Sequence, residues 1–220
     1  MKDVTLQRSY TPVLDSLNNR DVISDRSLHF LIKTYADGAV TKYLNDLKIG
    51  SSIMVSDTKG SFDRNILKRI CHLVIIYAGT GFTPMVKVMK EYLKHVENSS
   101  DTSTLTILSF NKSIEDIIWK DQLKSLEKSA SELPNLSINV HHTLSQDEPK
   151  QTGYNYGRIS PDLLNNLLKN NLKNNLDVTV SKISARLCCI CGPIPFNKEA
   201  KQIFEKQYDY KSEEIHVFEG

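Results

Sequence analysis

The amino-acid sequence predicts an α/β protein in which a β-rich segment precedes a doubly wound parallel sheet. From His72 onward, apolar runs of strand length alternate with amphipathic segments of helical spacing, which is typical of parallel strands joined by crossover helices. Before Phe62, short alternations of apolar and polar residues indicate β-strands instead. Between these two patterns, the segment LVIIYAGTGFTPM (Leu73–Met85) runs from a buried strand through two glycines into a helix.

Each element of the second part follows from its local pattern. Strands are expected at Leu73–Ala78, Leu105–Phe110, Leu136–His142, Leu187–Cys191 and Ile215–Phe218. Helices are expected between them at Met85–Val96, Ile114–Lys128, Pro161–Leu172 and Phe196–Tyr208. In the first helix one apolar face is formed by Met85, Val88, Met89, Tyr92 and Val96. Before the second helix, Ser113 followed by Asp116 predicts a capping box.

The first part has shorter signals. Leu28, Phe30 and Ile32 alternate with their neighbours along one expected strand, and Ser52–Val55 is another. Val40–Leu47, preceded by Gly38, predicts one or two helical turns. The change of pattern near Arg64–Cys71 indicates a domain boundary, which gives domains at residues 1–67 and 68–220.

One stretch, NNLLKNNLKNNL (Asn165–Leu176), is low in complexity. Its leucines recur at helical spacing, which predicts a surface helix that frays into a loop. An Asn-rich insertion on a solvent-facing surface is favoured over a functional role.

Composition narrows the classes of function. The 220 residues suffice for one large or two small domains, each with its own core. The net charge of +2 gives no reason to expect nucleic acid as the main partner. No apolar run approaches the roughly 20 residues of a membrane-spanning helix, and the N-terminal MKDVTLQRSY lacks the apolar centre of a secretory signal.

The cysteines and histidines do not predict a metal site. Cys188, Cys189 and Cys191 crowd one expected strand, where neighbouring side chains point to opposite faces, so reduced thiols are favoured over disulfides. A zinc site would need a second pair of ligands. His141 and His142 also diverge along a strand, and we expect them to be surface or edge residues.

The glycine turn carries the clearest chemical signal. A strand that ends in Gly79 and Gly81 and opens a helix places bare backbone amides beside a helix N-terminus, which suits a diphosphate. Pro84 takes the place of the third glycine of the usual dinucleotide motif, and the turn lies about a third of the way along the chain. Both features indicate a nucleotide-binding domain that follows another structure.

Four short motifs, in a fixed order, resemble those of one family. They are RSYTPV (Arg8–Val13), IKTY (Ile32–Tyr35) with DGAVT (Asp37–Thr41), AGTGFTPM (Ala78–Met85) and CICGP (Cys189–Pro193). Their order and spacing are similar to those of the ferredoxin-reductase superfamily, and within it to the cytochrome b5 reductases. The resemblance implies a partial antiparallel FAD-binding β-barrel followed by a doubly wound NAD(P)-binding domain.

The resemblance implies flavin contacts in the first part. The expected FAD-binding residues are Arg8, Ser9, Tyr10, Thr11, Ile32, Lys33, Tyr35, Gly38, Ala39, Val40 and Thr41. The planar guanidinium of Arg8 matches two diphosphate oxygens, and the Tyr10 ring can pack against the isoalloxazine. The residues alone leave other interpretations open: a cross-strand surface pair for Arg8 and Tyr10, a solvated strand face for Lys33, and a plain turn before Ala39.

In the second part, the resemblance implies that Gly79, Thr80 and Gly81 bind the diphosphate of the pyridine nucleotide. Further expected cofactor-binding residues are Thr83, Cys191, Gly192, Pro193 and, near the C-terminus, Phe218. Thr83 and Cys191 are the expected catalytic residues, one at the flavin and one beside the nicotinamide. By pattern alone a strand cysteine is more often a core residue, and we assign Cys188 and Cys189 to the core.

The implied activity is that of an FAD-dependent oxidoreductase that uses NADH or NADPH. A hydride passes to FAD, and single electrons then pass to a heme acceptor such as cytochrome b5 or a fused b5-like domain. The protein is expected to supply orientation and desolvation rather than an acid or base. A cytosolic location is the default expectation, and association with the endoplasmic reticulum is implied only by the resemblance.

Three departures from the family pattern leave alternatives. The RSYTPV strand begins at residue 8, whereas family members place several strands before it, so we expect an N-terminally truncated flavin domain. Ser145 stands where NADH-selective members carry an acidic residue, which leaves NADPH open. SDTKGSF (Ser56–Phe62) lacks the proline of a similar family turn. The alternatives are a non-catalytic nucleotide-binding remnant and a related reductase with a nitrate-reductase-type or ferredoxin-type acceptor.

Overall fold

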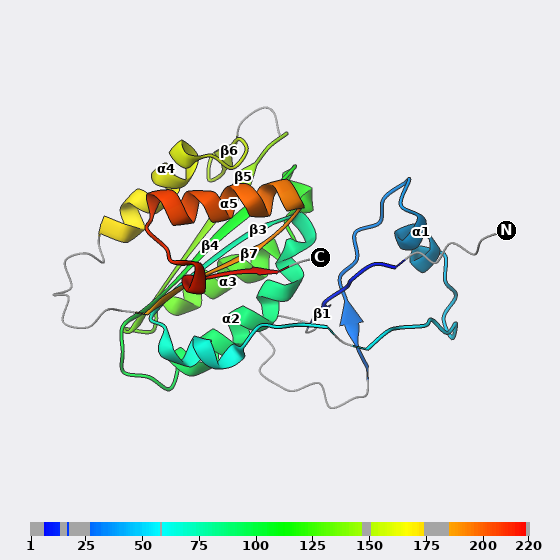
Figure 1. Cartoon of the computed structure of the whole chain (residues 1–220), viewed down its shortest axis with the longest axis horizontal. Helices are drawn as coiled ribbons and strands as arrows, with labels where there is room; N and C mark the ends of the chain where they lie inside the picture. Colours follow the sequence, from blue (N-terminus) through cyan, green and yellow to red (C-terminus); the bar gives the residue numbers. More distant parts are fainter. Residues whose placement is uncertain are drawn as a thin grey trace.

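The structure of the chain, a computed structural model, describes residues 7–13, 17, 27–57, 59–146, 151–173 and 185–218. Two parts are visible: a layered helix-and-sheet body, and a smaller N-terminal part that lies beside it (Figure 1). The expected division between residues 67 and 68 falls inside a 3-10 helix, η1 (Arg64–Arg69). The position of the boundary stays a prediction.

A six-stranded sheet, parallel throughout, forms the centre of the body. Its strands are β3 (His72–Ala78), β4 (Ser103–Asn111), β5 (Leu136–Leu144), β6 (Asn155–Tyr156), β7 (Arg186–Cys191) and β8 (Ile215–Phe218). The order β6-β5-β4-β3-β7-β8 runs outward from β3 in both directions. This topology confirms the predicted doubly wound sheet. Only β6 was not predicted, because a two-residue strand has no readable period.

Four helices cover the two faces of the sheet, with α2 (Phe82–Val96) and α3 (Lys120–Ala130) on one side and α4 (Pro161–Lys173) and α5 (Ile194–Gln207) on the other (Figure 1). α2 begins three residues before the predicted start, because Pro84 is tolerated in the first helical turn. The expected frayed end of the low-complexity helix lies partly outside the described residues.

The predicted helix at Ile114–Lys128 is wrong in its first half. Residues Ile114–Asp116 form a 3-10 turn, η3, and α3 starts only at Lys120. Trp119 has φ +53°, a left-handed conformation that interrupts the right-handed helix. The predicted capping box is also wrong, since the Ser113 side chain makes no capping hydrogen bond.

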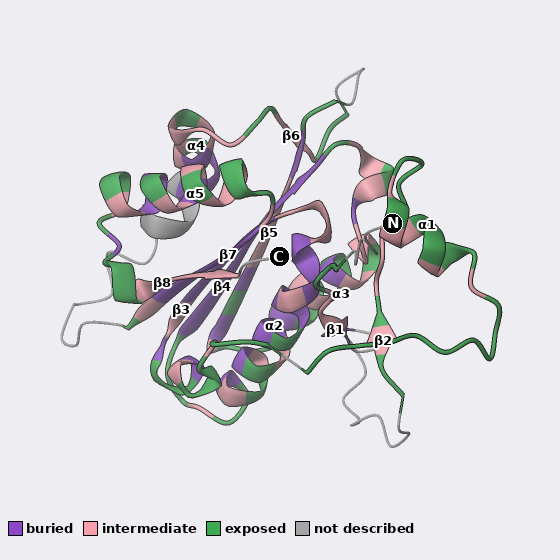
Figure 2. Ribbon diagram, turned by 45° about the vertical axis from the view of Figure 1, so that its right-hand side comes forward, coloured by how far each residue is buried: buried purple, intermediate pink, exposed green. Residues whose placement is uncertain are grey.

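Apolar side chains alternate between the two faces of the sheet and form two cores. In β3, Leu73, Ile75 and Tyr77 face the core under α2 and α3, whereas Val74 and Ile76 face the core under α4 and α5. The predicted apolar face of α2 is fully buried in the first of these cores. Figure 2 shows β3, β4 and β7 as the most continuously buried strands of the sheet. Burial on both faces explains why the strands read as unbroken apolar runs.

The N-terminal part holds little regular structure. β1 (Pro12–Val13) and β2 (His29–Phe30) pair in antiparallel fashion, and α1 (Ala39–Asn45) follows Gly38, as predicted. The strand predicted at Ser52–Val55 is wrong: these residues are exposed and non-helical, and no strand of the described chain pairs with them. An extended segment becomes a strand only where a neighbour satisfies its backbone groups.

Val13 and Leu17 help to anchor the N-terminal part to the body. Val13 and Leu17 are buried in the core that α2 and α3 cover. The backbone N–H of Leu17 also donates to Oε1 of Gln122 in α3, at 2.7 Å. β1 is therefore held against the helices of the sheet domain rather than only against β2.

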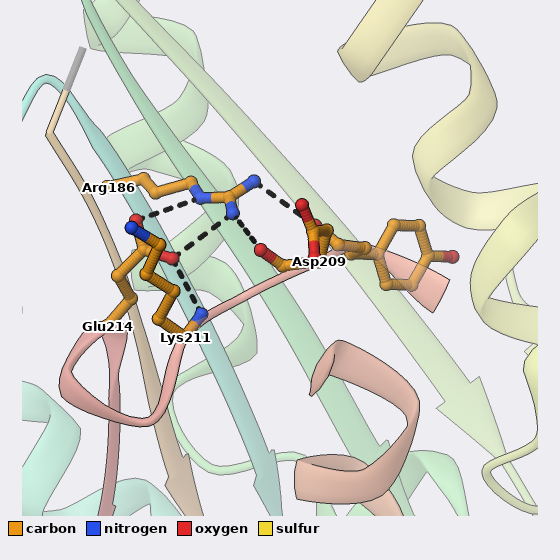
Figure 3. A network of polar contacts seen from close by, with 5 residues as sticks. Arg186, Asp209, Lys211 and Glu214 are labelled. Carbon is orange, nitrogen blue, oxygen red and sulfur yellow. Dashed lines mark hydrogen bonds and ion pairs between the residues drawn. The ribbon is translucent and has the colours of Figure 1, made fainter. Parts of the chain in front are cut away.

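At the end of the sheet where β7 begins, Arg186 links two turns to the strands (Figure 3). Its guanidinium donates to both carboxylate oxygens of Glu214, at 3.2 and 3.1 Å, and to the carbonyl oxygens of Tyr208 and Asp209. It also lies 4.1 Å from the ring centroid of Tyr210. These contacts fix the connection from α5 into β8.

The structure places the cysteines and the two histidines of β5 as the sequence predicted. All four cysteines are free, and Cys188 and Cys189 are fully buried. His141 and His142 are half-buried on β5, and at their positions this strand pairs only with β4, because β6 pairs with Thr143 and Leu144. Among the described residues they therefore lie at the edge of the sheet, as predicted. Burial, followed by the charges of Lys120 and His141, lowers the pKa of His142 to about 4. Within the described residues, no group of three or more His, Cys, Asp or Glu could hold a metal.

The described helices were also compared, in length and hydropathy, with a membrane-spanning helix. None of them is both long enough and apolar enough to cross a bilayer.

Candidate functional site

A cleft of about 2100 Å³ lies where the N-terminal part meets the carboxyl ends of the sheet strands. Every cofactor-binding residue expected from the sequence lines it: Arg8, Ser9, Tyr10, Thr11, Ile32, Lys33, Tyr35, Gly38, Ala39, Val40, Thr41, Gly79, Thr80, Gly81, Thr83, Cys191, Gly192, Pro193 and Phe218. These residues come from five separate segments of the chain. Their individual roles stay predictions.

The glycine turn after β3 forms the floor of the cleft. Gly79 has φ +54°, and a Cβ built on it would meet nothing within 4 Å, so the backbone is bare on that side. At Gly81, in contrast, a Cβ would lie 2.2 Å from the carbonyl oxygen of Cys191. Only glycine permits this approach between the 3-10 turn η2 (Gly79–Gly81) and the end of β7.

Thr83 follows β3 in the chain, and Cys191 ends the adjacent strand β7. Thr83 is buried in the first turn of α2, and its hydroxyl donates to the Thr80 carbonyl oxygen at 3.1 Å. Cys191 ends β7 and is 8% exposed. Burial raises the pKa of the Cys191 thiol to about 11, so the group is protonated at neutral pH. The thiol can therefore pack against a ring but is not poised as a thiolate nucleophile.

The segment that ends in α1 is closed by local hydrogen bonds. The Gly38 N–H donates to the Tyr35 carbonyl oxygen at 3.0 Å. Thr41 Oγ1 accepts from the Tyr35 N–H at 3.3 Å and donates to the Gly38 carbonyl oxygen at 3.2 Å. The expected FAD-binding residues from Tyr35 to Thr41 thus form an ordered turn at the edge of the cleft.

Arg8 and Tyr10 share the side of the chain that faces the cleft. Arg8 is exposed, and its Nη1 donates to the neighbouring Gln7 carbonyl oxygen at 2.8 Å. This contact uses one of its five N–H donors and leaves the rest of the guanidinium fork for a ligand.

An aromatic group closes the cleft on the β8 side. Phe62 lies 4.8 Å from His216 and 5.3 Å from Phe218, measured between ring centroids, and His216 lies 4.5 Å from Phe218. Burial lowers the pKa of His216, which favours a neutral imidazole in this group. The SDTKGSF segment, notable in the sequence only for a missing proline, supplies Phe62.

The sequence patterns missed several polar residues of the cleft. Asn111, the last residue of β4, is 7% exposed, and its Oδ1 has no hydrogen-bond partner among the described residues. Lys112, Asp116 and Arg158 also line the cleft, as does Ser145, which the sequence had already indicated as a determinant of nucleotide preference. A polar residue that ends a buried strand is the one local signal that could have identified Asn111.

The residues present fit a nucleotide cofactor. The cleft exceeds the 300–1,000 Å³ or so that a single small ligand occupies. The bare backbone at Gly79 and the unpaired, buried oxygen of Asn111 are features that a polar ligand would complete. The lining cations also outnumber the lining carboxylates, as a diphosphate requires.

Comparison with known proteins decides the family. The model described as the oxidoreductase NAD-binding domain matches residues 75–202, more than half of the chain. The chain belongs to this family. The model described as the oxidoreductase FAD-binding domain matches residues 1–63. Together the two matches confirm FAD and a pyridine nucleotide as the expected cofactors.

Individual relatives agree with the resemblance seen in the motifs. Cytochrome b5 reductase 4 of Danio rerio is 33% identical over 93% of this chain, and that of Rattus norvegicus is 35% identical over 96%. The chain spans only 35% and 38% of the length of these two relatives. The predicted similarity to the cytochrome b5 reductases is thus confirmed, and it extends over a little more than a third of the length of these two relatives.

A solved structure supports the fold. The structure described as the CS-b5R domains of human Ncb5or, in its NAD+ form, has a TM-score of 0.79 and 33% identity, and the match covers 100% of this chain and 57% of that one. The cytochrome b5 reductase domain of Ulva prolifera nitrate reductase shares the fold at 21% identity, with a TM-score of 0.62 and coverage of 87% and 70%.

Proposed function

We propose that this chain is the reductase portion of a flavoenzyme that oxidises NADH or NADPH and passes electrons to a heme acceptor such as cytochrome b5. One observation carries the proposal: a single cleft is lined by the RSYTPV and DGAVT segments, the glycine turn and Cys191. These segments come from both parts of the chain. When bound, FAD would accept a hydride from the nicotinamide and release electrons one at a time.

The protein residues orient and shield the reacting groups. The backbone amides at Gly79, Thr80 and Gly81 would hold the nucleotide diphosphate. The neutral thiol of Cys191 and the hydroxyl of Thr83 would flank the site of hydride transfer. The ring of Tyr10 and the aromatic group at Phe218 would exclude water from the flavin. No residue needs to donate or accept a proton for the hydride to move.

The preferred pyridine nucleotide depends on the end of β5. Ser145 follows this strand and is exposed on the cleft, with Lys112 and Arg158 also in the lining. A serine can contact a ribose hydroxyl and does not repel a 2′-phosphate. We therefore propose that the chain accepts both NADH and NADPH.

A second candidate function is a nucleotide-binding remnant without flavin. The observation that favours it is the exposure of large apolar side chains in the N-terminal part, at Leu28, Ile49, Met54 and Val55. Apolar side chains of a complete barrel would be covered. The remnant would keep the glycine turn and lack a stable flavin site.

Titration of the purified chain with FAD distinguishes the two candidates. The flavoenzyme is expected to retain FAD through gel filtration and to show the visible absorption bands of a protein-bound flavin. NADH should then bleach these bands, and oxidised cytochrome b5 added in a stopped-flow instrument should restore them. Binding of ADP-ribose without any retention of FAD would instead support the remnant. Bleaching by NADH without reoxidation by cytochrome b5 would point to another acceptor.

Replacing Arg8 by alanine is expected to raise the dissociation constant of FAD about tenfold, because a charge-assisted pair with the diphosphate is lost. The rate of hydride transfer at saturating FAD should change much less. Fluorescence titration with FAD measures the constant. Arg8→Lys is the matched control, since it keeps the charge and loses the planar fork. A dissociation constant unaffected by the alanine would remove Arg8 from the FAD site.

A further inference from the structure

An ion pair inside the cleft joins the two parts of the chain. Nζ of Lys33 lies 2.5 Å from Oδ1 of Asp116, although the residues are 83 positions apart. Lys33 follows β2, and Asp116 ends η3 after β4. Their side chains are 37% and 23% exposed, and both line the cleft. The pair is therefore partly shielded from solvent and faces any ligand that the cleft binds.

The negative charge of Asp116 is unusual in a cleft that is lined mainly by basic residues. The basic residues that line the cleft are Arg8, Lys33, Lys59, Arg64, Lys87, Lys112 and Arg158, and the acidic ones are Asp116 and Glu199. A carboxylate in this lining repels phosphate groups unless a cation neutralises it. Lys33 does so at contact distance. The pair is neutral as a unit, which suits the uncharged ring portion of a ligand better than its diphosphate.

The segment that carries Asp116 is rigidly held against the glycine turn. Ile117 is buried, and Trp119 packs edge-on against Phe82 with 5.6 Å between ring centroids. Phe82 is the first residue of α2 and follows Gly81 directly. Asp116 is thus attached to the same body as the nucleotide-binding turn.

Lys33 is held much less firmly by its own part of the chain. Its ammonium lies 5.9 Å from the ring centroid of Tyr35, which gives only a weak attraction. A lysine side chain has four rotatable bonds and loses considerable entropy when it is fixed. The carboxylate of Asp116 supplies the contact that selects one position of the ammonium.

We propose that Asp116 is a positioning residue that keeps the Lys33 ammonium beside the ring portion of the bound flavin and away from the phosphates. The inference rests on the proposed function, because it assigns a role within the proposed FAD site. Without the carboxylate, the flexible ammonium would move toward the nearest phosphate. The flavin would then lose the fixed ion pair near its ring and gain a mobile positive charge near its diphosphate.

The test compares FAD bound to the unsubstituted chain and to D116N, K33M and the K33M/D116N double variant. In D116N we expect the visible absorption maxima of bound FAD to shift, because the ring loses the fixed neighbouring ion pair. We also expect the FAD dissociation constant of D116N to rise about threefold more between about 20 mM and about 300 mM NaCl than that of the unsubstituted chain, since a new exposed phosphate contact is screened by salt. In the K33M background, the Asp116 substitution should act differently, because there is no ammonium to move and only an unneutralised carboxylate is removed.

Glu199→Gln is the matched control, because Glu199 lines the same cleft and no ion pair to it is found among the described residues. It should leave the flavin spectrum unchanged, and any change that it makes in the salt dependence should be the same with and without Lys33. Urea unfolding of the apoproteins separates positioning from simple loss of stability, which would leave the spectrum of bound FAD unaltered. Equal effects of D116N with and without Lys33, or an unshifted spectrum, would overturn the role of Asp116. Failure of the unsubstituted chain to bind FAD would overturn the proposed function itself.

Discussion

Replacing Gly81 by alanine is expected to weaken the binding of NAD+ or ADP-ribose by at least about tenfold and to lower the free energy of unfolding by about 1–3 kcal/mol. The added Cβ would lie 2.2 Å from the Cys191 carbonyl oxygen and 2.6 Å from its carbonyl carbon. Both are backbone atoms at the end of a strand and cannot rotate away. The turn or the end of β7 must therefore shift, and both line the cleft.

Isothermal titration with ADP-ribose and urea unfolding would measure the two effects. Gly60→Ala is the matched control, because a Cβ on Gly60 meets nothing within 4 Å although this glycine also lines the cleft. It should bind ADP-ribose as tightly as the unsubstituted chain. If Gly81→Ala bound the nucleotide equally well, the turn would not be the diphosphate site.

The region around Gly81 was predicted well from the sequence because its elements are encoded locally. The run from Leu73 to Met85 contains a buried strand, a turn with special backbone needs and an amphipathic helix, and each is encoded within a few residues. The β8 bounds, Ile215–Phe218, were predicted to the residue for the same reason. Local patterns sufficed for the buried strands β3, β4 and β7 and also for the half-buried edge strand β8.

Other features depended on partners that a local pattern does not contain. The exposed segment at Ser52–Val55 has the composition of a strand, yet it has no strand partner in the described chain. The break at Trp119 is fixed by packing against Phe82, whereas the residues around it favoured a continuous helix. Asp116 was predicted as part of a helix cap, and its place in the cleft beside Lys33 emerged only from the fold.

The residues of the candidate site also divide into those that local motifs predicted and those that only the fold brings to the cleft. Motif residues such as Arg8, Thr83 and Cys191 could be assigned because their short motifs resemble a family, and the fold then placed them in one cleft. Asn111 and Arg158 stand in no such motif. Asn111 ends β4 and Arg158 follows β6, on either side of β5, and this placement emerged only from the sheet order and register.

Replacing Arg186 by methionine is expected to lower the free energy of unfolding by about 2 kcal/mol, because the carboxylate of Glu214 and two carbonyl oxygens lose their donors. The value is below that for a fully buried pair, since the Arg186 side chain is 32% exposed. Asp209, one of the acceptors, has φ +53° and depends on its surroundings to keep this conformation. Urea unfolding measures the loss. Glu91→Gln, which removes an exposed pair with Arg64 at 3.6 Å, should cost about 0–1 kcal/mol.

The ion pair between Arg186 and Glu214 also predicts that the stability of the fold depends on pH. Burial by itself raises the pKa of Glu214, but the hydrogen bonds from Arg186 and the Lys211 N–H outweigh it and lower the pKa. A carboxyl whose pKa is lower in the folded state stabilises the fold above its unfolded pKa, and this contribution is lost as the pH falls through the folded value. Stability should thus decline in this acidic range in the unsubstituted chain and less so in Arg186→Met.

Because Glu214 precedes β8, which carries His216 and Phe218 to the cleft, the variant Arg186→Met should also bind FAD more weakly. Full FAD affinity in a destabilised Arg186→Met would show that β8 keeps its place without this network.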